Sequence, residues 1–482
     1  MSTFLTLQLF LVPYLLSVAA FIISENRTPK STFAWMLAFA LLPMVGLGIY
    51  LFFGRGHTAF MRKFRLTEQG APQQMARLFA QVEAEHAQAL AQFDATNPTA
   101  KRLATLLNSN SNSLVTTCNK VDLLQNADLT YPALLTAMGQ ATRSIHLHYY
   151  SWNADSFGDR LLTLLAQKVA EGVEVRILYD PIGSFTLLSR RYLRHARAAG
   201  IQIKAFSQLW RIHTISYRNH RKIAVIDGAV GFTGGLNIGD EHLAPPAGFD
   251  RWRDTHIRLE GSAVWALQSI FLVDWVNATD ETLDHARYFA PLPEALLTQF
   301  VPVQICLSGP DSEYEAIRQL YFEMITSAES HVLIQSPFFI LDETISEALK
   351  LKALSGVQVQ VMISSAGPGQ YLPYWAARTF AAEVARAGVD VQMYDAGYLH
   401  AKTICVDGTF CSVGSANWDI RSFSINYELT AVVYDAEIAG QLAASFAQDL
   451  AGCTKFDAEA YRHSPRLGRF RDSLARLASP LL

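Results

Sequence analysis

One eighteen-residue pattern occurs twice in this chain and limits its fold more than any other feature. The first copy runs from His220 to Asn237 and the second from His400 to Asn417, so the offset is 400 − 220 = 180 residues. In both copies a His, a Lys, an Asp, two Gly and an Asn hold the same positions, whereas the residues between them are only apolar or small. A repeat of this kind indicates two copies of one structural unit.

Each copy of the pattern is preceded by the same order of expected elements. An apolar strand leads to a helical stretch and then to a second apolar strand. These segments are 144–150, 158–171 and 173–179 in the first copy and 332–337, 343–354 and 357–364 in the second. Alternating strands and helices predict an α/β unit, with helices covering a sheet. The chain of 482 residues is long enough for two such halves.

Each pattern begins with a His and a Lys that share one face of a strand, because side chains alternate with a period of two. Two copies brought together would gather imidazoles, ammonium groups and amides in one pocket. These groups belong to His220, Lys222, Asn237, His400, Lys402 and Asn417. A phosphodiester would neutralise such lysines, and two histidines can supply a nucleophile and an acid. A lone His or Lys is more often structural, but two matched copies favour catalysis.

Four carboxylates accompany the two histidines. Asp227 and Asp407 belong to the repeated motif and are counted with its catalytic group, yet each precedes a Gly and also fits a β-turn, so we expect them to hold the turn or the lysines. Asp254 follows His220 by 254 − 220 = 34 residues, and Glu428 follows His400 by 428 − 400 = 28. We expect both to orient an imidazole by accepting from its second nitrogen. The alternative is that they are surface carboxylates.

The N-terminus contains two long runs without a charged residue, residues 4–23 and 32–53. Each is as long as the ~20 residues that an α-helix needs to cross a bilayer. We therefore expect a transmembrane hairpin, with a cleaved signal peptide or a buried core hairpin as alternatives. The turn carries Arg27 and Lys30, whereas four basic residues follow the second run, Arg55, Arg62, Lys63 and Arg65. This bias favours a cytoplasmic catalytic part.

Composition restricts the partners and cofactors. The net charge of −3 gives no general basic field for a nucleic acid. The five cysteines include no CxxC pair, and the motifs supply no cage of carboxylates, so we expect no metal and no cofactor.

The C-terminal tail predicts a basic amphipathic helix. Leu467, Phe470, Leu474 and Leu477 recur at intervals of three and four, and Arg466, Arg469, Arg471 and Arg476 fill other positions. Such a helix can lie in the headgroup layer of an anionic membrane. Alternatively, it packs its leucines against the catalytic halves and leaves its arginines in water.

At the repeated motifs the sequence resembles the phospholipase D superfamily, whose two HxK(x)4D motifs meet at a pseudo-twofold interface. The resemblance covers residues 119–450. Within the superfamily the chain is similar to bacterial cardiolipin synthases, through residues 27–30, 54–55, 149–152 and 479–482. The resemblance implies transfer of a phosphatidyl group between two phosphatidylglycerol molecules, through a phosphohistidine intermediate and without a cofactor, to give cardiolipin and glycerol.

The resemblance also implies separate roles for the two copies. His220 would attack phosphorus, and His400 would act as acid for the departing glycerol and then as base for the incoming hydroxyl. Sequence symmetry alone allows the reverse assignment. The lysines and Asn237 and Asn417 would hold the phosphoryl oxygens. Gly235 stands where the second copy has Ser415, so we expect a hydroxyl contact to phosphate from Ser415 only.

We therefore expect an α/β fold with two similar phospholipase D-like halves around a pseudo-twofold site, after a transmembrane hairpin. The expected segments are a membrane anchor at 1–56, a polar linker at 57–113, halves at 114–290 and 291–455, and the tail at 456–482. The expected partners are phosphatidylglycerol and anionic membrane lipid, and the expected location is the bacterial inner membrane, as a multi-pass protein. A hydrolytic phospholipase D, another phosphatidyltransferase and a membrane-tethered phosphodiester nuclease remain alternatives.

Overall fold

A computed structural model of the chain describes residues 3–25, 29–42, 46, 50, 73–207, 216–369 and 371–479. The chain forms two compact units, of which the first comprises Met1–Phe60 and Leu209–Ser216 and the second comprises Met61–Gln208 and Tyr217–Leu482. The two units are considered separately below.

The first unit contains two helices that pack together, α1 (Thr3–Ser24) and α2 (Pro29–Leu41). Ile22, Phe39 and Tyr50 form a small buried cluster, and the Tyr50 hydroxyl donates a hydrogen bond to Glu25 at 2.6 Å. The expected span at 32–53 lies partly outside the described residues. Among the helices that are described, none is both long enough and apolar enough to cross a membrane.

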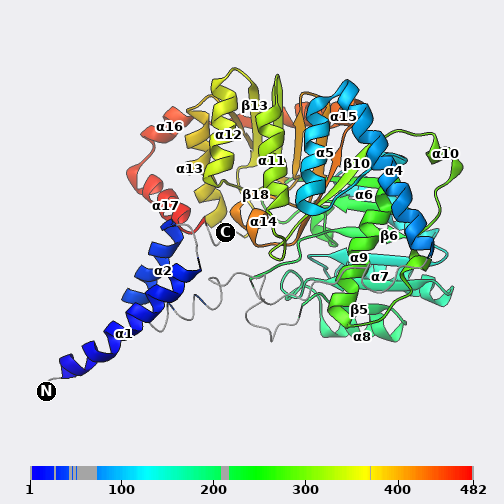
Figure 1. The fold of residues 1–482 in the computed structure, drawn as a ribbon, viewed down its shortest axis with the longest axis horizontal. Coiled ribbons are helices and arrows are strands. Elements are labelled where there is room, and N and C mark those ends of the chain that lie inside the picture. Colours follow the sequence, from blue (N-terminus) through cyan, green and yellow to red (C-terminus); the bar gives the residue numbers. More distant parts are fainter. Residues whose placement is uncertain are drawn as a thin grey trace. The chain divides into compact units, whose positions relative to one another are not determined.

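The second unit is built on two sheets of like topology (Figure 1). In the first half the strand order is β2-β9-β7-β6-β3-β4-β5, and in the second it is β10-β19-β17-β16-β11-β13-β14, with β1 and β20 at the edges. In both halves the strand after the repeated histidine, β6 or β16, runs antiparallel to the first apolar strand, β3 or β11. This correspondence confirms the two similar α/β halves.

The strands of the first sheet are β2 (Asn119–Gln125), β3 (Ser144–Tyr149), β4 (Glu174–Tyr179), β5 (Gln202–Ala205), β6 (Ile223–Ile226), β7 (Val230–Gly234) and β9 (Thr255–Gly261). Those of the second are β1 (Val115–Thr116), β10 (Val303–Ser308), β11 (His331–Ser336), β13 (Gln358–Ser364), β14 (Asp390–Tyr394), β16 (Thr403–Val406), β17 (Phe410–Gly414), β19 (Glu428–Val433) and β20 (Cys453–Lys455). Two short pairs lie outside the sheets, β8 (Trp252–Arg253) with β15 (Tyr398–Leu399) and β12 (Phe339–Ile340) with β18 (Trp418–Asp419).

Helices cover the sheets, and α5, α11 and α12 lie side by side over the second one (Figure 1). The helices associated with the first half are α6 (Asn126–Gly139), α7 (Ser156–Ala170), α8 (Arg190–Ala198), α9 (Ala263–Thr279) and α10 (Glu294–Leu297), with 3-10 turns η5 (Asp240–His242) and η6 (His285–Tyr288). The others are α4 (Gln73–Thr96), α5 (Pro98–Ser111), α11 (Ala316–Ser327), α12 (Glu343–Leu354), α13 (Leu372–Ala385), α14 (Ile420–Ser424), α15 (Ala436–Leu450), α16 (Ala458–His463) and α17 (Arg466–Leu477).

The two halves share one apolar cluster. Val225 and Leu259 of the first sheet belong to the same buried cluster as Cys405 and Val413 of the second, together with side chains of α9 and α15. Because this cluster joins the inner surfaces of both sheets, the halves are held in a fixed relation, which the site between them requires.

The expected polar linker at 57–113 is wrong over its described part. Residues 73–111 form α4 and α5, which pack on the second half. Ala89 and Phe93 of α4 and Leu103 and Leu107 of α5 are buried in the core of that half. The polar composition of this stretch belongs to the outer faces of the two helices, whereas the residues that recur every fourth position face the core.

Candidate active site

Each repeated histidine is fixed by backbone contacts to the other half. The His400 N–H donates to the carbonyl of Arg253 at 2.7 Å, next to the parallel pairing of β15 with β8. The His220 N–H donates to the carbonyl of Tyr427 at 2.9 Å, beside a parallel bridge between Asn219 and Tyr427. Each histidine segment therefore lies along the segment of the other half that leads to a buried carboxylate.

Because of these backbone contacts, each histidine lies next to a carboxylate of the other half. His220 Nδ1 lies 3.0 Å from Glu428 Oε1, and His400 Nδ1 lies 2.6 Å from Asp254 Oδ2. Both carboxylates are fully buried, so they are not surface groups. Since Nδ1 of each ring faces a carboxylate, the proton on that nitrogen is held there and Nε2 is left for chemistry. Each carboxylate thus contacts the histidine of the opposite copy.

Lys222 and Lys402 are fully buried beside the histidines. Lys222 Nζ donates to the His220 carbonyl at 2.6 Å, and Lys402 Nζ donates to the His400 carbonyl. Burial lowers the pKa of Lys222 to about 7 and that of Lys402 to about 8. A buried ammonium pair is costly without an anion, so the pocket favours a ligand such as a phosphodiester.

The environment also favours neutral imidazoles in the free enzyme. Burial lowers the pKa of His220, although the charge of Glu428 opposes this effect. Burial, together with Lys402 and Lys222, lowers the pKa of His400 well below its ordinary value. A neutral His220 can act as a nucleophile through Nε2. His400 would gain a proton more readily once a phosphate anion offsets the two lysines.

Asp227 and Asp407 do not contact the histidines, so the prediction that counts them with the catalytic group is wrong. The Asp227 carboxylate accepts from the backbone N–H groups of residues 142, 143 and 144, and Asp407 does the same for residues 329, 330 and 331. Both also have a positive φ at an Asp-Gly turn. Each aspartate binds the turn after its motif strand to the segment that enters β3 or β11. This agrees with the expectation that the two aspartates hold a turn.

Ser415 is not placed to bind a phosphate, because its hydroxyl is already engaged. It donates to Glu428 Oε2 at 2.5 Å and accepts from the Leu429 N–H at 3.0 Å. At the equivalent Gly235, an added Cβ would lie 2.0 Å from Asp254 Oδ1. The two copies therefore differ at this position because of their neighbouring carboxylates. Gly235 leaves space for Asp254, whereas Ser415 donates a hydrogen bond to Glu428.

The asparagines are both buried and differ in their contacts. Asn237 Oδ1 accepts from the Ser151 N–H at 3.1 Å, which directs its amide nitrogen away from that loop. Asn417 Oδ1 is buried without a hydrogen-bond partner among the described residues. Amide groups of this kind can donate to phosphoryl oxygens.

Aromatic residues and a further carboxylate complete the surroundings, and the repeated motifs do not identify them as site residues. Tyr150 lies edge-on to His220 at 4.8 Å between ring centroids, and Trp252 and Tyr398 lie 5.2 and 5.6 Å from His400. Asp180 accepts from the Asn219 N–H at 2.8 Å and so fixes the residue before His220. Tyr150 and Asp180 directly follow the apolar strands β3 and β4, a position that could have identified them.

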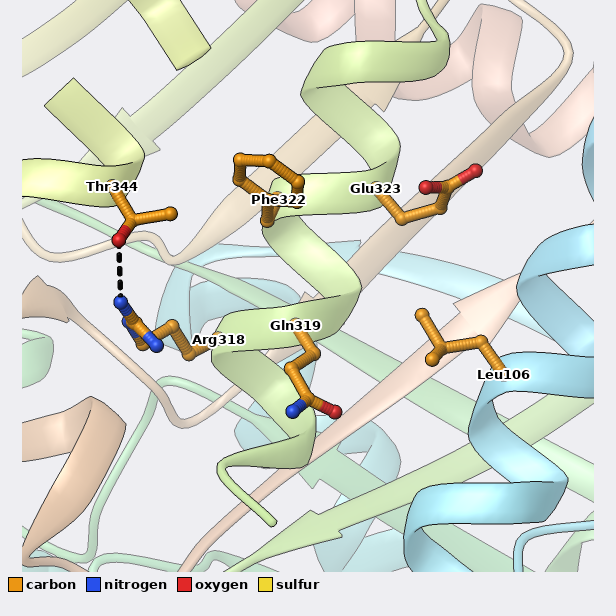
Figure 2. A pocket seen from close by; sticks show the side chains of 6 residues that line it. All are labelled: Leu106, Arg318, Gln319, Phe322, Glu323 and Thr344. Atoms are coloured by element: carbon orange, nitrogen blue, oxygen red, sulfur yellow. Dashed lines mark hydrogen bonds between the residues drawn. The ribbon is translucent and has the colours of Figure 1, made fainter. Parts of the chain in front are cut away.

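A separate hollow of about 320 Å³ lies on the outer surface of the second half, between α5, α11 and α12. Figure 2 shows its lining, in which Arg318 donates to Thr344. Asp342 and Glu315 also pair with Arg318, so its charge is already balanced. The hollow contains none of the motif residues.

Across the residues that the structure describes, no group of three or more His, Cys, Asp or Glu side chains is arranged to hold a metal ion.

Comparison with known families agrees with this geometry. Residues 134–248 and 321–450 match the family described as cardiolipin synthase, PLD-like domain, and these segments contain both motifs and part of each half. The chain belongs to this family. Residues 12–55 match a second family, described as Phospholipase_D-nuclease N-terminal.

Full-length relatives carry the same name. The chain is 37% identical to a cardiolipin synthase of Oceanobacillus iheyensis, over 100% of this chain and 99% of the relative. It is 38% identical to the major cardiolipin synthase ClsA of Bacillus subtilis, over 99% and 98%. Among solved structures, phosphatidylserine synthase of Haemophilus influenzae aligns with a TM-score of 0.60 at 14% identity, over 80% of this chain and 100% of that one. That likeness supports the fold alone.

Proposed function

We propose that this chain transfers a phosphatidyl group from one phosphatidylglycerol to another and releases glycerol, with cardiolipin as the lipid product. The observation that carries the proposal is the pair of buried histidines with crossed carboxylates, next to two buried lysines. Family membership along the whole chain supports the same reaction. No step calls for a metal or an organic cofactor.

In the first step His220 Nε2 attacks the phosphorus of the donor lipid. A nitrogen–phosphorus bond forms, and the bond from phosphorus to the oxygen of the headgroup glycerol breaks. His400 Nε2–H gives its proton to that oxygen. Lys222 and Lys402 stabilise the charge that builds on the phosphoryl oxygens, and the amides of Asn237 and Asn417 donate to the same atoms. Glu428 stabilises the positive charge that develops on His220.

In the second step the neutral His400 accepts the proton of the primary hydroxyl of a second phosphatidylglycerol. That oxygen attacks phosphorus, and the bond to His220 breaks, which returns both histidines to their starting states. Asp254 stabilises the imidazolium form of His400 in each step. Two phosphatidylglycerols thus give one cardiolipin and one glycerol, with all protons accounted for.

The first unit is proposed to anchor the enzyme in the inner membrane as a helical hairpin, with the catalytic part on the cytoplasmic side. Two uncharged runs and the family match at 12–55 support an anchor. Large apolar side chains also lie exposed on α1 and α2, including Leu16, Phe33 and Leu41. The excess of basic residues after the second run supports the orientation.

The direct test is incubation of the purified full chain with phosphatidylglycerol, followed by separation of the lipids and assay of free glycerol. The proposal predicts cardiolipin and glycerol in equal amounts. Phosphatidic acid as the main lipid product would instead identify a hydrolase, because water would then be the acceptor. A His220→Ala variant at matched protein level is the control for contaminating activity.

A further inference from the structure

The C-terminal helix α17 presents its apolar residues outward. Leu467, Phe470, Leu474 and Leu477, here called the apolar ridge, are 80%, 66%, 57% and 77% exposed. The opposite face of the helix is the buried one and carries Asp472 and Ala475. The alternative in which the leucines pack against the catalytic halves is therefore wrong for this helix.

Polar and cation–π contacts attach α17 to α13, so its orientation does not depend on the leucines. The Arg471 guanidinium lies 4.4 Å from the centroid of the Trp375 ring, and Arg378 Nε of α13 lies 3.6 Å from Asp472 Oδ2. Arg476 lies 4.1 Å from the centroid of the Phe380 ring and donates to Glu383 at 2.6 Å. These contacts fix the helix with its ridge facing outward.

The surface around the ridge has the chemistry of a lipid-binding face. Arg471 contacts Trp375 near the start of α13, where Tyr371 and Leu372 add further exposed apolar area. Arg462 and Arg466 lie exposed on α16 and α17, although the chain as a whole has a net charge of −3. Apolar side chains flanked by arginines match the boundary between acyl chains and anionic headgroups.

Helix α13, on which α17 packs, also contacts the surroundings of the active site. The Tyr374 hydroxyl of α13 donates to the Tyr398 hydroxyl at 3.3 Å, and the Tyr398 ring lies 5.6 Å from that of His400. A diacyl lipid leaves a bilayer at great cost, so its phosphodiester has to reach the site while its chains stay in the membrane. A lipid-binding surface on α13 and α17 would place that boundary close to His400.

We infer that the apolar ridge of α17 inserts into the surface of an anionic bilayer and holds the catalytic unit there. Its occupant is lipid, rather than a second copy of the chain or the N-terminal helices. The anionic character of the bilayer rests on the proposed function, because phosphatidylglycerol is anionic. The exposure of the ridge and of the arginines beside it is independent of that proposal.

The contact can be measured in the full chain, reconstituted in phosphatidylglycerol vesicles that contain brominated acyl chains. Leu474→Cys carries a bimane label, in a background where the partly exposed Cys118 and Cys453 are replaced by Ser. Leu297→Cys is the matched control, because Leu297 is 53% exposed and lies on α10, at the other end of the catalytic unit (Figure 1). Brominated lipid should quench the label at position 474 and leave the label at position 297 bright.

A second measurement separates this inference from the proposed reaction. Replacement of all four ridge residues by Gln should lower turnover of bilayer phosphatidylglycerol by roughly tenfold or more. Turnover of a short-chain, monomeric phosphatidylglycerol should stay unchanged. If neither enzyme used phosphatidylglycerol, the proposed reaction would be wrong, but quenching at position 474 would still support the lipid contact.

Absence of quenching at position 474 overturns the inference, and two results with the unlabelled Leu474→Cys variant would then name the occupant. A disulfide between the introduced thiols of two chains would identify a second copy. A disulfide between the introduced thiol and a cysteine placed in α1 or α2 would identify the N-terminal helices.

Discussion

The histidines of this site are oriented across the interface between the halves. His220 depends on Glu428 and His400 on Asp254, so neither repeat contains a complete catalytic dyad of its own. If the two histidines have different roles, the two carboxylates support different steps. This consequence can be tested with single substitutions.

A phosphatidyl ester of p-nitrophenol separates the steps, since this leaving group departs without a proton from His400. With Glu428→Gln we expect the burst of nitrophenol to slow by about 10²–10⁴-fold, because His220 loses its partner. With Asp254→Asn the burst should remain and later turnover should fall by a similar factor. Stopped-flow absorbance resolves both phases. The reverse pattern would pair each carboxylate with the other step.

Placing Ala at equivalent positions of the two copies should have unequal effects. Gly235→Ala introduces a Cβ 2.0 Å from Asp254 Oδ1, so it should displace that carboxylate and reduce kcat/KM nearly as far as Asp254→Asn. Ser415→Ala removes one hydrogen bond to Glu428 and should cost about tenfold. Steady-state kinetics on both variants makes the comparison. Equal losses would contradict this account of the Gly–Ser difference.

The buried lysines predict how activity depends on pH. Burial lowers the pKa of Lys222 to about 7 and of Lys402 to about 8, so the free enzyme loses positive charge in its site as the pH rises through this range. We expect kcat/KM to fall as the pH rises above about 7 while kcat changes less, because bound phosphate keeps the lysines protonated. Rate profiles from pH 5 to 10 measure both. A kcat/KM that stays constant through pH about 9 would contradict the prediction.

At the scale of elements, the motif aspartates connect one strand to another. Asp227→Ala should lower the stability of the protein by about 2–3 kcal/mol, because it removes the acceptor for three backbone amides and disfavours a positive φ. The kcat/KM of the folded enzyme should be unchanged. Thermal unfolding and kinetics on the same sample provide the measurement.

His220→Ala is the matched control for Asp227→Ala and should show the opposite signature, with normal stability and no activity. A stable but inactive Asp227→Ala enzyme would return that aspartate to the catalytic group. The same reasoning applies to Asp407, which holds the equivalent turn of the second half.

Sequence patterns predicted the elements that depend on local periodicity. The strands and helices around both motifs agree with the structure, because β3, β4, β11 and β13 are short, largely apolar runs that are almost fully buried. The packing of α4 and α5 on the core was not predicted, because the stretch is largely polar and half of its side chains in that core are alanines, such as Ala89 and Ala104. The crossed carboxylates could not be predicted, since spacing along one repeat does not determine which copy lies beside it.

At the scale of the whole molecule, both halves contribute to one candidate active centre. The shared apolar cluster and the two backbone clamps hold His220 and His400 in one site, with a carboxylate from each half behind the ring of the other. The two histidines are therefore expected to act in sequence on the same phosphorus rather than as two independent sites.

The most direct test of this claim is to trap the covalent intermediate. The full-length enzyme is mixed with phosphatidylglycerol labelled in the phosphatidyl group, quenched in alkali within a single turnover and digested, and the labelled peptide is mapped by tandem mass spectrometry. We expect one adduct per chain, located on His220, and no adduct in His220→Ala. Label on His400, label on both histidines, or turnover without any adduct would contradict it.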